Sequence, residues 1–152
     1  MKNAVFCLMA ALLLMVSCSE PASYERFIKS SDTDSLGRFC YEFDLDTAAV
    51  YDISVYTRID ACGKGVQWHG DIRMDAIWTS PSGNQFFETV YIPRKEFTSR
   101  LSIESDCVVR YRSGIRPDEA GLWNLMLALP ELTGAEGFRG MGIKITLWER
   151  IN

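Results

Sequence analysis

The chain has little of what most catalytic, metal and cofactor sites need. Its 152 residues include a single histidine, His69, and its five cysteines show no C-x-x-C spacing. Zinc and redox sites use such ligands at short spacings, so neither is expected. The sequence also lacks the G-x-S-x-G motif of many hydrolases and the G-x-G-x-x-G motif of dinucleotide-binding folds. We therefore expect no cofactor, no metal and no catalytic residues, and we expect the protein not to be an enzyme.

An excess of positive charge is also missing. The chain carries 16 lysines and arginines against 20 acidic residues, a formal net charge of −4 at pH 7. Nucleic acids and anionic lipid surfaces attract basic proteins, so neither is an expected partner through charge. Long hydrophobic runs are equally scarce, because only residues 4–16 form one. That run would rise about 20 Å as a helix, whereas a bilayer core is roughly 30 Å thick.

The opening stretch, "MKNAVFCLMAALLLMVSCSE", reads as a targeting signal. Lys2 supplies a positive start, and the apolar run has the length of a secretory signal. Met15-Val16-Ser17-Cys18 resembles the lipobox of bacterial lipoproteins, in which the cysteine is acylated and becomes the first mature residue. We predict a signal peptide over residues 1–17 and a membrane anchor of lipid on Cys18. Ser19 favours the outer membrane. A plain secretory signal and a retained anchor are the alternatives.

Three further cysteines remain, Cys40, Cys62 and Cys107. An exported protein can hold a disulfide, but three thiols cannot all pair within one chain. Cys40 and Cys107 lie in strand-like runs and are interpreted as small apolar side chains that face a core. Cys62, in the loop "DACGKG", is the best candidate for an exposed thiol.

The remainder divides into a tether and one domain. Residues 18–35 are polar and without a hydrophobic period, which predicts a lipidated tether, although Tyr24 and Phe27 are expected to dock on something. Residues 36–152 repeat with a period of two, which predicts an antiparallel β-sandwich, jelly-roll or immunoglobulin-like, of about seven or eight strands. The alternating runs are Phe39–Leu45, Tyr51–Ile59, Ile72–Trp78, "QFFETVYIP", "DCVVRYR", "GLWNLMLAL" and "GIKITLWE". "SPSGNQ" predicts a turn, because proline and glycine punctuate strands.

Two features invite a functional interpretation. The glycines of "GAEGFRGMG" lead into a strand, so we interpret them as an irregular crossing before that strand and not as a phosphate site. Trp68 lies beside His69 in a loop-like stretch, and these two residues are the candidate binding surface. Trp78, Trp123 and Trp148 fall within alternating runs, where core packing is the commoner explanation.

Several of these pieces together resemble the GldH-like gliding-motility lipoprotein family. The residues that carry the resemblance are the lipobox, "YERF", "FCYEFDL", "YDISVYTRI", "IWTSPSG", "GLWNLML" and "LTGAEGFRGMGIKI", in that order over residues 15–148. "ACGKGVQWHGD" and "RPDEAGLW" depart from the expected pattern. The resemblance implies an envelope lipoprotein linked to gliding and type IX secretion, with no catalytic residues, and relatives also occur in bacteria not known to glide.

The sequence therefore predicts a non-enzymatic, lipid-anchored envelope protein that contributes a β surface to a membrane-associated assembly, with protein partners. The alternative is a cell-surface module that binds glycans or peptides through exposed tryptophans. A hydrolase would need carboxylates from separate strands to converge in a cleft.

Overall fold

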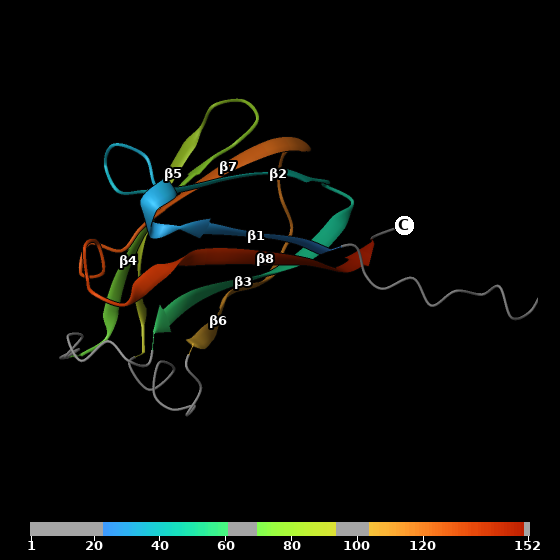
Figure 1. Ribbon diagram of the computed structural model, residues 1–152. Helices are drawn as coiled ribbons and strands as arrows, with labels where there is room; N and C mark the ends of the chain where they lie inside the picture. Colours follow the sequence, from blue (N-terminus) through green and yellow to red (C-terminus); the bar gives the residue numbers. More distant parts are fainter. Residues whose placement is uncertain (1–22, 61–69, 94–103, 151–152) are drawn as a thin grey trace, which may run out of the picture.

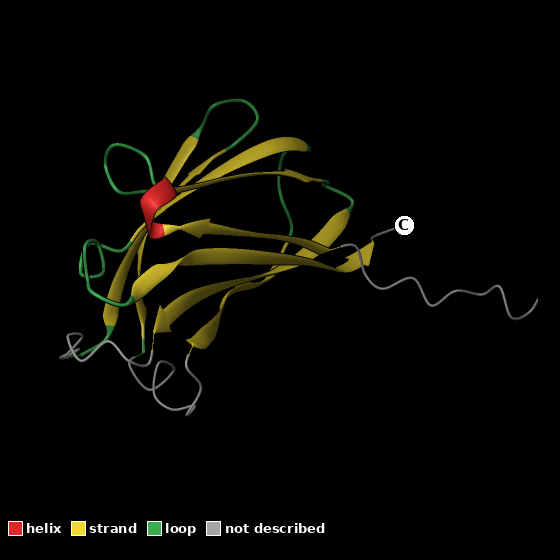
Figure 2. Ribbon diagram, viewed as in Figure 1, coloured by secondary structure: helices red, strands yellow, loops and turns green. Residues whose placement is uncertain are grey.

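The computed structural model describes residues 23–60, 70–93 and 104–150, and these form two packed β-sheets (Figure 1). Figure 2 shows that strands dominate this part of the chain, joined by loops, with one 3₁₀ turn at Ser30–Asp32. The strands are β1 (Ser23–Lys29), β2 (Phe39–Leu45), β3 (Ala49–Asp60), β4 (Ile72–Thr79), β5 (Gln85–Ile92), β6 (Glu104–Ile115), β7 (Gly121–Ala128) and β8 (Phe138–Arg150).

The two sheets have four antiparallel strands each. One sheet has the order β1-β8-β3-β6 and the other the order β2-β7-β4-β5, which is the jelly-roll arrangement (Figure 1). The predicted antiparallel β-sandwich is therefore confirmed, in its jelly-roll form. Among the described residues, no helix has the length and apolar character needed to cross a membrane.

Strict alternation in the sequence becomes alternation of burial. In β2, Phe39, Tyr41, Phe43 and Leu45 are buried and the residues between them are exposed. The facing strand contributes Met141, to whose carbonyl oxygen the buried Tyr41 hydroxyl donates at 2.7 Å, so that the bond ties the two sheets together. The most deeply buried side chains include Ile53, Met74, Leu125, Leu127 and Ile143, from both sheets, and Leu132 from the turns between β7 and β8. This shared apolar layer is the core that holds the sandwich closed.

The predicted turn at "SPSGNQ" joins β4 to β5. The amide of Ser80 donates to Asn84 at 2.9 Å, and Gly83 takes a φ of 90°, which favours glycine. The carboxylate of Glu119 accepts from the Ser80 hydroxyl at 3.0 Å and from the Ser82 amide at 2.9 Å. The loop before β7 is thereby fastened to this turn. The run "GLWNLMLAL" is a strand as expected, because β7 lies between β2 and β4.

Part of the predicted tether is instead a strand. Ser23–Lys29 forms β1, which pairs with β8 from Ser23↔Thr146 to Lys29↔Gly140. The sandwich thus includes residues before position 36, and a tether over 18–35 is wrong for this segment. Edge strands bury only part of one face, so β1 needs few apolar side chains: Ile28 is buried and Phe27 half-buried. The predicted signal peptide, residues 1–17, lies outside the described residues.

The glycine-rich stretch is irregular only in its first half. Turns precede β8, as predicted, but Gly140 and Gly142 lie within β8 itself. A Cβ at Gly142 would lie 2.1 Å from the Tyr56 ring, and one at Gly140 would lie 2.2 Å from the carbonyl oxygen of Ile28. The missing side chains therefore let a tyrosine and a neighbouring backbone approach the strand closely.

Two of the predicted core residues face outward. Cys40 lies on the exposed face of β2, because it falls between the buried Phe39 and Tyr41 in a strand of period two. Trp148 is 68% exposed. Val50 pairs with Glu149 and Tyr51 with Leu147, which leaves Trp148 as the extra residue of a bulge. Ile143, Ile145 and Leu147 take the inward positions of β8, so plain alternation already places the Trp148 indole on the outer face, next to this bulge.

Candidate functional site

The residues that sequence reasoning selected for function lie where the structure gives no description. Cys18, Trp68 and His69 all fall outside the described residues, as does Cys62. Cys107 is placed only through its backbone, in β6 opposite Thr57 of β3. Within the described residues, the places open to a ligand or partner are the two open edges of the sandwich and its two outer faces.

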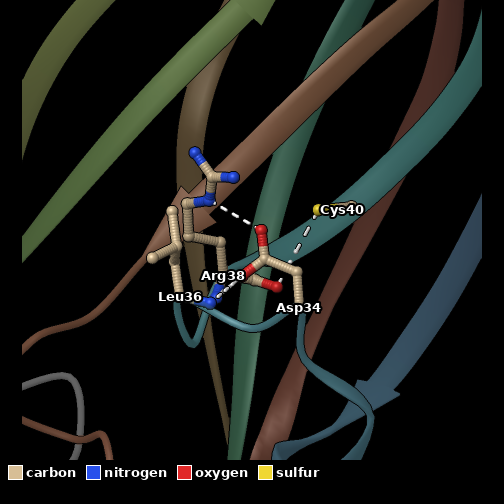
Figure 3. A network of polar contacts seen from close by, with 4 residues as sticks. All are labelled: Asp34, Leu36, Arg38 and Cys40. Carbon is tan, nitrogen blue, oxygen red and sulfur yellow. Dashed lines mark hydrogen bonds and ion pairs between the residues drawn. The ribbon is translucent and has the colours of Figure 1, made fainter.

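A cleft of about 350 Å³ opens at the edge formed by β1 and β2. Its lining residues are Arg26, Phe27, Ile28, Asp32, Thr33, Asp34, Arg38 and Cys40. Asp34 organises the loop below it, because its carboxylate accepts from the backbone amides of Leu36 at 2.9 Å and Arg38 at 2.8 Å (Figure 3). The Arg38 Nε donates to the same carboxylate at 2.7 Å. These bonds, led by the Arg38 amide, lower the pKa of Asp34. The carboxylate serves the loop and leaves little for a ligand.

Cys40 at the rim of this cleft is a weak nucleophile. Burial, followed by the negative charge of Asp34, raises the pKa of the Cys40 thiol, and Arg38 opposes the rise only in part. Reactive cysteines need the opposite surroundings, in which positive charge stabilises the thiolate. Its sulfur lies 3.9 Å from the Arg38 carbonyl oxygen, a weak contact (Figure 3). We therefore see no catalytic role for this thiol.

The opposite edge holds a polar cluster between the sheets. Glu88 of β5 pairs with Ala76, whose side chain is buried, so the Glu88 carboxylate lies on the inner face. It accepts hydrogen bonds from the Tyr111 hydroxyl and the Arg112 guanidinium of β6, and from the Trp78 indole at 3.3 Å. The indole also donates to the Tyr111 oxygen at 2.9 Å.

Because three donors engage the Glu88 carboxylate, it suits a clamp between sheets better than a general base. Burial raises the pKa of Tyr111, which keeps its hydroxyl protonated and able to donate. Among residues 23–60, 70–93 and 104–150, no group of three or more histidine, cysteine or acidic side chains could hold a metal ion.

The outer face of the β2-β7-β4-β5 sheet carries an apolar row that crosses all four strands. Cys40 is opposite Met126, Met126 is opposite Ile77, and Ile77 is opposite Phe87. All four alternate with inward-facing neighbours, so their side chains point outward; Phe87 is 70% exposed and Ile77 and Met126 are half-buried. We call these four residues the apolar row.

Polar side chains border the apolar row on both sides. One neighbouring row consists of Glu42, Asn124, Thr79 and Gln85, in directly opposed pairs. On the other side, Asp75 accepts from Thr89 at 2.6 Å and from Arg73 at 3.0 Å. An apolar centre with a polar rim is the usual anatomy of a protein interface.

The outer face of the other sheet has a different character. Its central cross-strand row runs through Glu25, Lys144, Ser54 and Arg110. Phe27 and Tyr56 stack beside that row with centroids 5.9 Å apart, and the Arg58 guanidinium lies 5.1 Å above the Phe27 ring. Val108, which is 60% exposed, is opposite Tyr56, so this face also carries apolar side chains, but that row passes through Gly142. The apolar row of the β2-β7-β4-β5 sheet differs because each of its four strands contributes a side chain.

The tryptophans divide between core and surface. Trp123 is 6% exposed and packs edge-on against the half-buried Trp78, in agreement with the expected core role for both. Trp148 is the exception described above. Sequence reasoning missed Ile77 and Met126, although each is an apolar residue at an outward position of an alternating run. Their alignment becomes visible only once the strand register is known.

No protein-family model matches the chain, and no curated protein is similar to it.

Proposed function

We propose that this protein is a non-enzymatic, lipid-anchored component of an envelope assembly, and that it binds a protein partner through the outer face of the β2-β7-β4-β5 sheet. The observation that carries the proposal is the apolar row, which crosses the whole face and includes the 70% exposed Phe87. Contiguous exposed apolar patches that are rimmed by polar residues mark interaction sites, whereas single exposed apolar residues are common on soluble proteins. Met126 at its centre supplies an adaptable contact.

Charge on the same face indicates the chemistry of the partner. Glu42 and Asp44 lie exposed on β2. On β4, by contrast, the charge of Asp75 is offset by Arg73, and its carboxylate also accepts from Thr89. The β2 side of the face is therefore acidic. A complementary partner would present an apolar centre with basic side chains opposite β2, because complementary charge steers association and suppresses wrong partners.

The opening of the chain supports the location. The short apolar run and the Met15–Cys18 lipobox suit a lipoprotein signal, and Ser19 suits delivery to the outer membrane. The resemblance to the GldH-like family supports a place beside the gliding or type IX secretion machinery. The acyl chains on Cys18 would hold the sandwich at the membrane.

The docking face is tested by affinity capture of the tagged, lipidated protein from gently solubilised envelopes, followed by mass spectrometry. Two double variants are compared with the wild type: I77K/M126K on the apolar row, and S54K/T146K on the outer face of the other sheet. Both add two positive charges to half-buried outward positions of central strands. We expect the first to lose the partner and the second to retain it. Equal recovery from both would contradict the proposal.

The anchor has a separate test. Cys18→Ser is expected to abolish the incorporation of labelled fatty acid and to release the protein from membranes, because no other acylation site is proposed. Unchanged labelling would show that the opening stretch has another role.

Glycan binding is a second candidate, supported by one arrangement on the same face. Phe87 and Tyr91 are 70% and 61% exposed, and both project outward from β5, on either side of Thr89. Aromatic faces flanking a polar group can stack on sugar rings. Phe87→Ala should then reduce glycan binding. The recovery of a protein partner, which also depends on Ile77, is measured in the same extracts. Absence of binding to any glycan in a screen would remove this candidate.

A further inference from the structure

Strand β5 leaves one edge of its sheet without a partner strand. It is the last strand in the order β2-β7-β4-β5. The backbone N–H and C=O groups on the side away from β4 therefore have no partner strand among the described residues. Its sequence, "QFFETVYI", contains no proline, lysine or arginine, and its pairing with β4 is regular over all eight residues. Such an edge is a template for another strand.

The other three edges are protected in ways that β5 is not. β1 carries Arg26 opposite Ile143, an inward-pointing charge at the edge. β6 carries Arg110 and Arg112, and its pairing with β3 has register shifts. β2 alternates its buried residues with Cys40, Glu42 and Asp44. Charges and irregularities of these kinds discourage edge-to-edge pairing.

The one charge on β5 is already neutralised. Glu88 points inward, where Arg112 forms an ion pair with it and the Tyr111 hydroxyl donates to it. The carboxylate is therefore held between the sheets of its own sandwich and does not obstruct a strand that arrives from outside.

The sequence of β5 is complementary to itself in one antiparallel register. With Thr89 on a twofold axis, Thr89 faces its own copy, and Phe87 of each strand faces Tyr91 of the other. On the inner side Glu88 faces Val90, and Phe86 faces Ile92. Two aromatic pairs would form on the outer face, from side chains that are 70% and 61% exposed in the single chain. Aromatic cross-strand pairs stabilise antiparallel sheets. An axis at Glu88 would instead oppose two carboxylates, and an axis at Val90 would use less of the strand.

We propose that two copies of this chain pair through their β5 strands with Thr89 on the twofold axis. The four-stranded β2-β7-β4-β5 sheets of the two copies then form one continuous sheet, and each apolar row continues from its Phe87 to Tyr91 of the other copy. The dimer does not depend on lipid attachment or on the identity of an envelope partner. It goes beyond the proposed function because it makes the docking face bivalent.

The register is tested with two double variants of the full, lipidated chain, examined in detergent by native mass spectrometry over a range of concentrations. F87K/Y91K places like charges opposite each other in this register, whereas F87K/Y91E places opposite charges there. Both lose the same two aromatic rings, and both positions are exposed, so the fold is preserved. We expect a wild-type dimer, a monomeric F87K/Y91K, and a dimer affinity of F87K/Y91E at least about tenfold above that of F87K/Y91K. Cys40→Lys, at the far edge of the same face, should leave the dimer unchanged.

A photo-crosslinking amino acid at position 89, in whole membranes, identifies the occupant of the edge. An adduct of twice the chain mass supports the dimer, and an adduct with a different protein overturns it. A wild-type monomer at every concentration, or equal affinities for the two double variants, also overturns it. A monomer that still captures a partner through Ile77 and Met126 counts against the dimer alone, and an intact dimer without a captured partner counts against the docking face alone.

Discussion

The contact between Gly142 and Tyr56 yields a prediction in which a mutational effect changes sign. Gly142 of β8 lies between Phe27 of β1 and Tyr56 of β3 in the cross-strand register. A Cβ on this glycine would lie 2.1, 2.4 and 2.5 Å from three atoms of the Tyr56 ring. Tyr56 is only 9% exposed, so its ring is packed in place and would have to move. Gly142→Ala therefore displaces the tyrosine from its stack on Phe27.

The expected cost follows from what the ring loses. Full burial of a large apolar side chain contributes about 1.5–3 kcal/mol, and an aromatic pair adds about 0.5–1.5 kcal/mol. A displaced ring loses part of both, so we expect Gly142→Ala to lower the free energy of unfolding by about 2 kcal/mol. In a Tyr56→Ala background the obstacle is gone. Alanine is favoured over glycine within a strand by about 0.5–1 kcal/mol, so the same substitution should then stabilise the protein.

The measurement is urea unfolding of the wild type, the two single variants and the double variant, which together give the coupling free energy. We expect a coupling of about 2.5–3 kcal/mol. Gly140→Ala serves as the control, because its Cβ would lie 2.2 Å from the carbonyl oxygen of Ile28, which is backbone. It should destabilise the protein whether or not Tyr56 is present. A Gly142→Ala cost that is equal in both backgrounds would refute the reasoning.

Three other predictions concern burial and charge. Thr57 is 1% exposed, and its hydroxyl has no hydrogen-bond partner within the described chain, so Thr57→Val should raise the free energy of unfolding by about 1 kcal/mol in urea denaturation. Leu127→Ala should lower the free energy of unfolding by about 2–5 kcal/mol in the same assay, because this side chain is fully buried. Leu122, in contrast, is 47% exposed, so Leu122→Ala should cost less than about 0.5 kcal/mol. Equal costs would contradict the assigned faces of β7. Hydrogen bonds, first of all from the Ser82 hydroxyl, lower the pKa of Glu119 below its ordinary value of 4.5. The resulting stabilisation is complete above that value and is lost as the pH falls through the lower folded pKa. The difference in Tm between the wild type and Glu119→Gln should therefore be greatest at neutral pH and shrink below about pH 4.5; a difference independent of pH would contradict this role.

The sequence by itself determined the fold class and most strand positions. Phe39, Tyr41 and Phe43 alternate with polar residues, and a period of two leaves no other regular structure that buries one face. Pro81 and Gly83 marked the turn between β4 and β5 for local conformational reasons. These signals act over a few residues, which is why they can be interpreted without knowing what the chain packs against.

Only the tertiary structure decided which surface is a candidate for function. Cys40, Met126 and Phe87 are far apart in the sequence and meet in one row because of the register between β2, β7, β4 and β5. β1 was missed because an edge strand stabilised by its ladder with β8 needs little hydrophobic pattern of its own. Register, edges and bulges depend on hydrogen bonds between distant segments, and local periodicity carries no information about them.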